Sequence, residues 1–297
     1  MLTVLLEYRK SWITDLLWIG LAIAVAMAAT TQIQAYSAGA RAMGRNFYGG
    51  VRGIDGNEPG FGAKRTMLHG VISHGSQFLE PERRKQTTTY HAPGSGIELA
   101  IHALPEPAHV GVIGLGAGTL AAYGRKGDQY RFYEINPLVI DFARRQFTYL
   151  GDSDAKVEVV LGDGRSSLER EVDQKFDLLV VDAFSGDSIP VHLLSLEAFE
   201  LYFQRLTAVG VLALHISNES LDLEPVVQKA AESGAYSALI FHNAENPRIG
   251  QSEAIWALLT RGNQPDTSLP GGGRPLSVKR HLRAWTDGYS NLLQILK

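Results

Sequence analysis

Four short apolar runs, each ending at a glycine turn or an acid, constrain the fold of this chain more than any other feature. The residues at their carboxyl ends are Gly114, Glu134, Asp163 and Asp182. The runs have the length of buried strands, and in an open α/β sheet ligands bind beyond the carboxyl ends of the strands. The sequence therefore predicts one binding edge that carries a glycine turn and three acids.

Strand-like and helix-like segments alternate from residue 109 onward. This alternation predicts an α/β fold, a Rossmann-like doubly wound parallel sheet with right-handed crossovers. The polar loop 243–253 has no helical pattern, so we expect an antiparallel hairpin at one sheet edge. The strands are expected near residues 109–115, 130–135, 157–162, 176–182, 210–216, 237–242 and 254–260, with helices at 138–149, 192–206 and 222–233.

The segment before the sheet predicts a small β domain. Residues 47–54 and 64–72 read as a hairpin across a Gly/Asn/Pro turn, and a short strand is expected near 76–79. A helix is expected over 97–104, and the small polar residues 37–46 read as a linker. We expect an anchor and linker over 1–45, the β domain with its lead-in helix over 46–104, and the Rossmann domain over 105–297.

The segment Leu16 to Ala29 is apolar and uncharged, and it predicts an N-terminal hydrophobic helix. A membrane-spanning helix needs about 20 mostly apolar residues, which the segment approaches if it extends to Ile33. We favour membrane attachment through residues 12–33, with a soluble, cytoplasmic catalytic domain. A signal-peptide core and a buried amphipathic helix are the alternatives.

Composition excludes several classes of function. The chain has no cysteine, a net charge of −3 and no long basic block, which argues against thiolate chemistry and nucleic-acid binding. His69 and His74 lie on an expected strand and turn without a close acid, and His91 has none either, so no metal is expected. His215 is interpreted as a core histidine of a buried strand.

The glycine turn Gly114-Leu-Gly116-Ala-Gly118 lets a ligand approach the backbone closely. It is one residue shorter than the dinucleotide motif and does not by itself separate NAD from adenosyl ligands. Glu134 is expected to bind ribose hydroxyls in either case. Asp163, followed by Gly164, favours an adenosine with a sulfonium group, because an acid there can accept the adenine amine; a helix-capping role is the alternative.

Asp182 is the candidate catalytic residue. It ends a strand that we expect beside the glycine-turn strand, where a carboxylate can attract a sulfonium and accept a proton from an attacking amine. A helix-capping role fits Asp187 or Ser188 better than Asp182.

The chain resembles the spermidine synthase (polyamine aminopropyltransferase) family, and more closely its membrane-fused bacterial branch. The resemblance rests on a set of short motifs: His69-Gly70, His74-Gly75-Ser-Gln77, Tyr90-His91, Gly114–Gly118, Tyr133–Asn136, Gly162–Gly164, Val181–Phe184 and Trp285–Tyr289. It implies a small β domain joined to a methyltransferase-like Rossmann domain.

The resemblance also implies an activity, the transfer of an aminopropyl group from decarboxylated S-adenosylmethionine to a small amine. Asp182 would be the base, and Gln77 would join Glu134 and Asp163 at the nucleoside. Tyr90 is expected to line the amine site, with His91 and Asp187 beside it. No metal cofactor is expected, and a homodimer is compatible with the sequence.

Two departures from the family pattern keep other functions open. Family members that make spermidine carry acids where this chain has Ala92 and Ala117. Asp187, Glu197 or Glu253 are candidates to compensate. Otherwise the donor is intact S-adenosylmethionine and the chain is a methyltransferase of a small substrate. A non-catalytic nucleoside- or polyamine-binding module is the third hypothesis.

Overall fold

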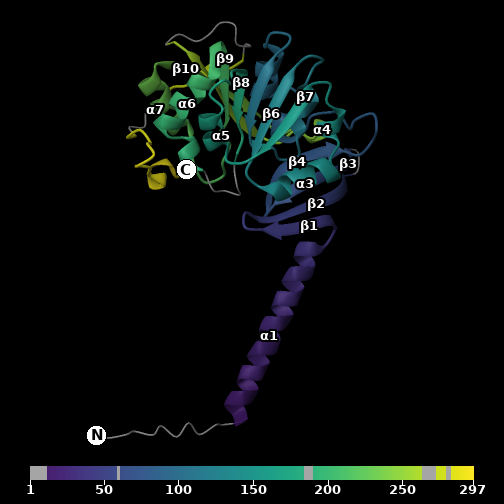
Figure 1. The fold of residues 1–297 in the computed structure, drawn as a ribbon. Helices are drawn as coiled ribbons and strands as arrows, with labels where there is room; N and C mark the ends of the chain where they lie inside the picture. The colour runs from purple at the N-terminus through teal and green to yellow at the C-terminus, as the bar shows by residue number, and fades with distance from the viewer. Residues whose placement is uncertain (1–11, 59–60, 184–189, 263–271, 279–281) are drawn as a thin grey trace, which may run out of the picture. The chain divides into compact units, whose positions relative to one another are not determined.

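The computed structural model describes residues 12–58, 61–183, 190–262, 272–278 and 282–297. The chain divides into two compact units, residues 1–40 and 41–297. An eight-stranded sheet forms the centre of the larger unit (Figure 1). Its strands are β5 (His109–Ile113), β6 (Gln129–Glu134), β7 (Lys156–Leu161), β8 (Phe176–Val181), β9 (Leu206–His215), β10 (Tyr236–Asn243), β11 (Ala254–Arg261) and β12 (Arg274–Pro275).

The strand order β12-β10-β11-β9-β8-β5-β6-β7 confirms the doubly wound sheet. β5 lies between β6 and β8 and is parallel to both, so the glycine turn and Asp182 emerge side by side, as predicted. β10 and β11 form the predicted antiparallel hairpin. The two-residue edge strand β12 was not predicted, because its polar surroundings carry no strand pattern.

Helices cover both faces of this sheet. Figure 1 shows α5, α6 and α7 together on one face, where they pack in one buried apolar cluster. A second cluster joins α2 and α3 to the opposite face. The helices are α2 (Gly96–His102), α3 (Pro137–Gln146), α4 (Tyr149–Asp152), α5 (Gly164–Arg170), α6 (Leu196–Arg205) and α7 (Glu224–Gly234), with short 3-10 turns η1 (Thr89–His91), η2 (Thr119–Tyr123), η3 (Val191–Leu193), η4 (Pro247–Ile249) and η5 (Leu292–Ile295).

Helix ends differ from the prediction where caps intervene. α3 begins after Asn136, whose side chain accepts the Leu138 N–H, with Pro137 in its first turn. The helix predicted over 138–149 is therefore shorter and is followed by the separate turn α4. α6 begins after the cap Ser195 rather than at residue 192. α5 was not predicted, because seven residues carry too little apolar periodicity to be recognised.

Four antiparallel strands form the predicted small β domain: β1 (Ala40–Asn46), β2 (Gly49–Glu58), β3 (Gly62–His69) and β4 (Ile72–Phe78). The linker predicted over 37–46 is wrong from residue 40 onward, because Ala40–Asn46 pairs with β2 as an edge strand. Its small polar residues lack the apolar alternation by which strands are recognised. This sheet and the large sheet belong to the same compact unit.

Within its described residues, the N-terminal unit contains the helix α1 (Trp12–Ser37). Its segment Thr14–Ser37 has a mean hydropathy of 1.9 and no buried share, and it is long and apolar enough to cross a membrane. Apolar side chains occupy every side of α1, so it has no polar face. A helix of this kind needs lipid or protein around it.

Candidate functional site

Asp182 lies at the carboxyl end of β8, where its backbone N–H continues the parallel ladder by donating to the Ile113 carbonyl over 2.9 Å. Its side chain is 10 % exposed and contacts two imidazoles. Oδ2 is 3.0 Å from Nε2 of His91, and Oδ1 is 2.9 Å from Nδ1 of His215. We call these three residues the Asp182 cluster.

The Asp182 cluster holds a buried negative charge. Burial alone would raise the pKa of Asp182, but the charge and hydrogen bonds of His215 and His91 outweigh it and hold the pKa well below its ordinary value. Burial lowers the pKa of His91. Because an ionised carboxylate only accepts hydrogen bonds, each facing ring nitrogen has to donate its proton. Asp182 is therefore an anion with both oxygens engaged.

Aromatic rings fix the orientation of His215. Its imidazole stacks on Tyr90, with ring centroids 4.3 Å apart and an interplanar angle of 16°. Trp256 lies 4.9 Å away at 29° and donates from Nε1 to the Tyr90 carbonyl over 3.0 Å. Burial raises the pKa of Tyr90 far above its ordinary value, so its phenol stays protonated. The ring stack thus leaves His215 little rotational freedom.

The segment that carries Tyr90 and His91 is tied to the β10–β11 hairpin. Thr89 adopts a left-handed backbone conformation, with φ of 55°. Its N–H donates to the Gly250 carbonyl over 2.6 Å, and its carbonyl accepts from the Ser252 N–H over 3.2 Å. Surrounding contacts have to hold a non-glycine residue in this conformation. The hairpin therefore sets the position of the two site residues that follow Thr89.

A cavity of about 630 Å³ opens beside Asp182. Four of its described lining residues are acids, and Lys297 carries the only fixed positive charge among them. The remaining lining comes from β4 and its turn, from Tyr90 and His215, and from the segments after β9 and before β11. The acids are Asp182, Glu219, Glu245 and Glu253. Such a lining favours a cationic ligand.

The glycine turn lies next to this cavity along the sheet edge. Gly114, Gly116 and Gly118 have φ values of 99°, 52° and 82°, which other residues rarely adopt. The Leu115 N–H donates to Oε2 of Glu134 over 3.1 Å, and the Asn136 N–H donates to Oε1 over 2.8 Å. Burial raises the pKa of Glu134 above its ordinary value, although these N–H groups oppose the shift.

Strand β4 covers the glycine turn at Ala117. The Ala117 N–H donates to the His74 carbonyl over 2.8 Å, and the side chain is buried. A β-carbon on Gly75 would stand 2.8 Å from the Ala117 methyl group. Position 117 is therefore closely packed in this chain.

Asp163 has the helix-capping role that was the alternative interpretation of its sequence position. It caps α5, accepting the Ser166 N–H over 2.8 Å, and its other oxygen is 3.1 Å from Nε2 of His192. The hydrogen bond with His192 lowers the pKa of Asp163 to about 2. Gly164 follows in close contact with Ile113, where a β-carbon would overlap. Asp163 lines a second cavity of about 490 Å³.

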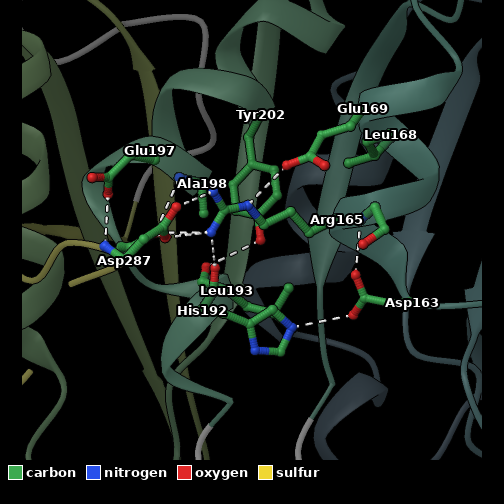
Figure 2. A network of polar contacts seen from close by, with 12 residues as sticks. Asp163, Arg165, Leu168, Glu169, His192, Leu193, Glu197, Ala198, Tyr202 and Asp287 are labelled. Atoms are coloured by element: carbon green, nitrogen blue, oxygen red, sulfur yellow. Dashed lines mark hydrogen bonds and ion pairs between the residues drawn. The ribbon is translucent and has the colours of Figure 1, made fainter. Parts of the chain in front are cut away.

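Arg165 fastens the C-terminal motif beside Asp163 (Figure 2). Its two terminal nitrogens each lie 2.6 Å from an oxygen of Asp287. Ser195 also donates to Asp287 over 2.6 Å, and Arg165 donates to the His192 carbonyl over 2.8 Å. Arg165 thereby connects α5, the turn before α6 and the C-terminal segment.

One further predicted site residue, Gln77, lies apart from these groups. Gln77 is buried between β4 and α4, where its amide nitrogen donates to the Arg84 carbonyl and the Thr148 hydroxyl, each over 2.8 Å, and its oxygen accepts the Thr148 N–H over 3.0 Å. It joins two structural elements. Asp187 lies outside the residues that the structure describes.

Sequence reasoning did not place His215 beside Asp182. The structure places this residue at the end of β9, one strand from Asp182, at the same edge of the sheet. The rule that identified the acids, function at the carboxyl end of a strand, applies equally to a histidine there. The described residues contain no group of three or more His, Asp or Glu side chains arranged to hold a metal ion.

The architecture defines a class: it is the Rossmann-like methyltransferase fold with a small antiparallel sheet added in front. Over residues 96–241 the sequence matches the spermine/spermidine synthase domain. This match confirms the resemblance to the spermine/spermidine synthase family.

Two curated relatives carry polyamine aminopropyltransferase names. The Vibrio vulnificus protein is 28 % identical over 163 residues, covering 52 % of each chain. The probable enzyme of Bifidobacterium longum is 29 % identical over 160 residues, covering 52 % of this chain and 33 % of its own. The chain thus spans about half or less of the length of these relatives.

The spermidine synthase of Thermotoga maritima has a similar fold. Its structure aligns with a TM-score of 0.54 at 17 % identity, over 78 % of this chain and 76 % of the other. This similarity supports the fold assignment.

Proposed function

We propose that this protein is an aminopropyltransferase that moves an aminopropyl group from decarboxylated S-adenosylmethionine to a small amine. The observation that carries the proposal is the group of four carboxylates around the cavity at the end of β8, next to the glycine turn. Donor and acceptor are both cations, and buried ammonium and sulfonium groups need anionic partners. The match to the spermine/spermidine synthase domain supports the same reaction.

The reaction is a direct displacement at carbon. The acceptor nitrogen forms a bond to the aminopropyl carbon, the carbon–sulfur bond breaks, and its electron pair stays on sulfur as the thioether nucleoside leaves. The acceptor nitrogen releases one proton, which the Asp182 cluster receives. We expect most of the rate enhancement to come from alignment of the amine with the sulfonium group.

The donor would lie along the carboxyl edge of β5, β6 and β7. The backbone at Gly114, Gly116, Gly118 and Gly164 presents no side chain to it, and a β-carbon at each of these positions would press on protein atoms. Glu134 would accept hydrogen bonds from the ribose hydroxyls. Asp163 would accept one from the adenine amine, which would replace its contact with His192. We place Gln77 behind the nucleoside, as a residue that holds α4 in position.

The acceptor would occupy the acidic cavity, which Tyr90 lines, with His91 behind it in contact with Asp182. A role of Asp187 at the amine stays a prediction from the sequence. Glu245 and Glu253 lie where an extended amine could place a second ammonium group. Glu253 was one of the acids expected to compensate for Ala92 and Ala117. The cavity supports that role for it, whereas Glu197 accepts the Asp287 N–H at a different site.

Methyl transfer from intact S-adenosylmethionine is the second candidate. The close packing of Ala117 favours it, because no carboxylate at that position can hold the ammonium of an aminopropyl group. A binding module without turnover is the third. The three readings differ in donor preference and in the effect of removing the charge of Asp182.

Calorimetry and a transfer assay separate these candidates. We expect the protein to bind decarboxylated S-adenosylmethionine and methylthioadenosine more tightly than S-adenosylmethionine, and to convert a diamine to its aminopropyl product. Asp182→Asn should abolish transfer and keep methylthioadenosine binding. Tighter binding of S-adenosylmethionine, together with formation of a methylated product, would show that the protein is a methyltransferase and not an aminopropyltransferase. Binding without any product would indicate the sensor module.

We further propose that α1 attaches the protein to a membrane, as in the membrane-fused branch of the family, with the catalytic unit in the cytoplasm. Val25 lies near the middle of the apolar segment. Val25→Lys should release the full chain from membranes, because a charge at the centre of a membrane helix costs about 2.5–3.5 kcal/mol. Val25→Leu is the matched control. Release of the wild-type chain by carbonate extraction would rule out a spanning role.

A further inference from the structure

We propose that His215 is the catalytic residue that takes the proton from the acceptor amine, with Asp182 as the residue that positions it. The inference rests on the proposed aminopropyl transfer and specifies the atom that receives the proton. It changes the role first expected for both residues, since His215 was interpreted as a core histidine and Asp182 as the base.

The geometry of Asp182 makes it a poor proton acceptor. Both of its oxygens already accept N–H groups, from His91 and from His215. Protonating one oxygen would replace a hydrogen bond by a repulsive contact with the facing N–H. The depressed pKa of the carboxyl group agrees with this reading, because a weaker base takes up a proton less readily.

His215 meets the requirements that Asp182 does not. It lines the acidic cavity, whereas the described lining does not include His91. Its Nδ1–H donates to Asp182, so in the neutral ring Nε2 carries the lone pair. When Nε2 takes the proton, the positive charge of the ring lies 2.9 Å from the Asp182 carboxylate. Tyr90 and Trp256 hold the ring plane during the transfer.

His74 is the other imidazole among the described residues that line the cavity. Burial lowers its pKa to about 4, with the nearby charge of His69 adding to the effect and that of Asp182 opposing it. Within the described residues no hydrogen bond joins the His74 side chain to a carboxylate, whereas Nδ1 of His215 is 2.9 Å from Asp182. A proton placed on His74 would therefore lack the stabilisation that Asp182 gives to His215.

The proton transfer accompanies bond formation. As the amine nitrogen bonds to carbon and sulfur leaves with the electron pair, the nitrogen becomes an ammonium and passes one proton to Nε2 of His215. The groups that surround this imidazole are Asp182, His91, His74, Tyr90 and Trp256. Release of the product and return of the proton to solvent restore the neutral ring.

The test compares His215→Asn with His215→Gln in the full chain. Asparagine keeps an N–H donor near the Nδ1 position and removes the group that takes the proton. We expect kcat with decarboxylated S-adenosylmethionine and a diamine to fall about 10²–10⁴-fold, with methylthioadenosine affinity unchanged within twofold. The fall of kcat at low pH, which we call the acidic limb of the pH profile, should disappear. Added imidazole should restore part of the rate. His242→Asn, at an exposed position of β10 outside the described cavity lining, is the matched control.

Several outcomes would overturn the inference. If His215→Asn kept kcat within threefold and retained the acidic limb, another group would take the proton. Should both variants unfold, ¹⁵N NMR of the wild-type imidazoles with methylthioadenosine bound gives the answer. The titration midpoint of His215 has to coincide with the acidic limb of kcat; a ring that stays protonated through that limb contradicts the role.

Failure of the proposed function looks different. If the wild-type protein forms no aminopropyl product with any diamine, aminopropyl transfer itself is wrong. If the wild-type protein turns over and only the His215 results disagree, the assignment of the proton acceptor alone is wrong.

Discussion

Gly114 lies directly against the backbone of Asp182: a β-carbon on Gly114 would overlap the Asp182 carbonyl group. The contact follows from the pairing of β5 with β8, which brings Ile113 opposite Val181 and so places the next residues of both strands together. The glycine turn and the Asp182 cluster are thus parts of one backbone arrangement, and a change in the first has to displace the second.

Gly114→Ala should therefore damage both folding and activity. The substitution forces a left-handed φ of 99° on alanine as well as the overlap. We expect a loss of at least about 1–3 kcal/mol in the free energy of unfolding, together with loss of transfer. Urea denaturation and product assays measure the two effects.

Gly151→Ala is the control for this substitution. Nothing lies within 4 Å of a β-carbon at Gly151, which is in the helical turn α4. It should leave stability equal or slightly higher. Equal stability of Gly114→Ala and the wild-type protein would contradict the close approach of the two strands.

Glu245→Gln and Glu253→Gln should weaken binding of the acceptor. Both carboxylates line the acidic cavity and are exposed to solvent. Removing one solvent-exposed charge changes binding by about 0.2–1 kcal/mol, so KM for a diamine should rise up to about fivefold, less at high salt. Steady-state kinetics at two salt concentrations measures this.

In the two glutamate variants the affinity for the donor should change little, in contrast to the KM for the diamine. Glu200→Gln on α6, an exposed glutamate outside the cavity lining, should leave the diamine KM unaltered. An acceptor KM that is insensitive to both cavity substitutions would place the amine elsewhere.

Asp163 should make stability depend on acid pH. Its pKa is lowered to about 2 from an ordinary value of 3.8, first by the hydrogen bond with His192. A lowered carboxyl pKa stabilises the folded state above pH 4, and this contribution is lost as the pH falls toward 2. Asp163→Asn, which still caps α5, should cost stability above pH 4 and show a shrinking difference below it.

Urea unfolding of Asp163→Asn and wild-type protein across pH 2–7 measures this difference. Asp154→Asn on an exposed turn is the control and should differ little from the wild-type protein at any pH. A difference for Asp163→Asn that stays constant down to pH 2 would contradict the coupling with His192.

Arg165→Lys should loosen the C-terminal motif. The guanidinium contacts Asp287 through two nitrogens, and a lysine ammonium cannot reproduce that geometry. Loss of charged hydrogen bonds costs about 1.5–3 kcal/mol, and amides near residues 285–289 should exchange faster with solvent. Hydrogen exchange by mass spectrometry measures the local change.

Arg144→Lys, at an exposed position of α3, provides the comparison for Arg165→Lys and should leave exchange over 285–289 unchanged. Unaltered exchange in Arg165→Lys would show that the motif is held by other contacts.

The sequence was sufficient for the large sheet except for β12, because its buried strands are continuous apolar runs. The carboxyl ends of such runs lie at the ligand-binding edge of the sheet, which made Glu134, Asp163 and Asp182 candidate site residues. β1 and α5 carry no such signal: β1 is a half-exposed edge strand of small polar residues, and α5 is short. Their conformation depends on neighbours far away in the chain.

The environment of Asp182 could not be predicted in the same way. His91 and His215 reach it from segments 91 residues before and 33 residues after it. No local pattern connects a histidine after a 3-10 turn with another at a strand end. Pairings of this kind become visible only when the order of the strands in space is known.

The backbone pairing of Thr89 with the β10–β11 hairpin has an evolutionary consequence. The hairpin carries Glu245 and Glu253, which would determine the specificity for the acceptor. The segment after Thr89 carries the rings of Tyr90 and His91, which would lie near the reacting nitrogen. A lengthened or shortened hairpin would shift both at once. Divergence toward a new amine in this lineage should therefore proceed by exchange of single side chains, with the length of the hairpin preserved.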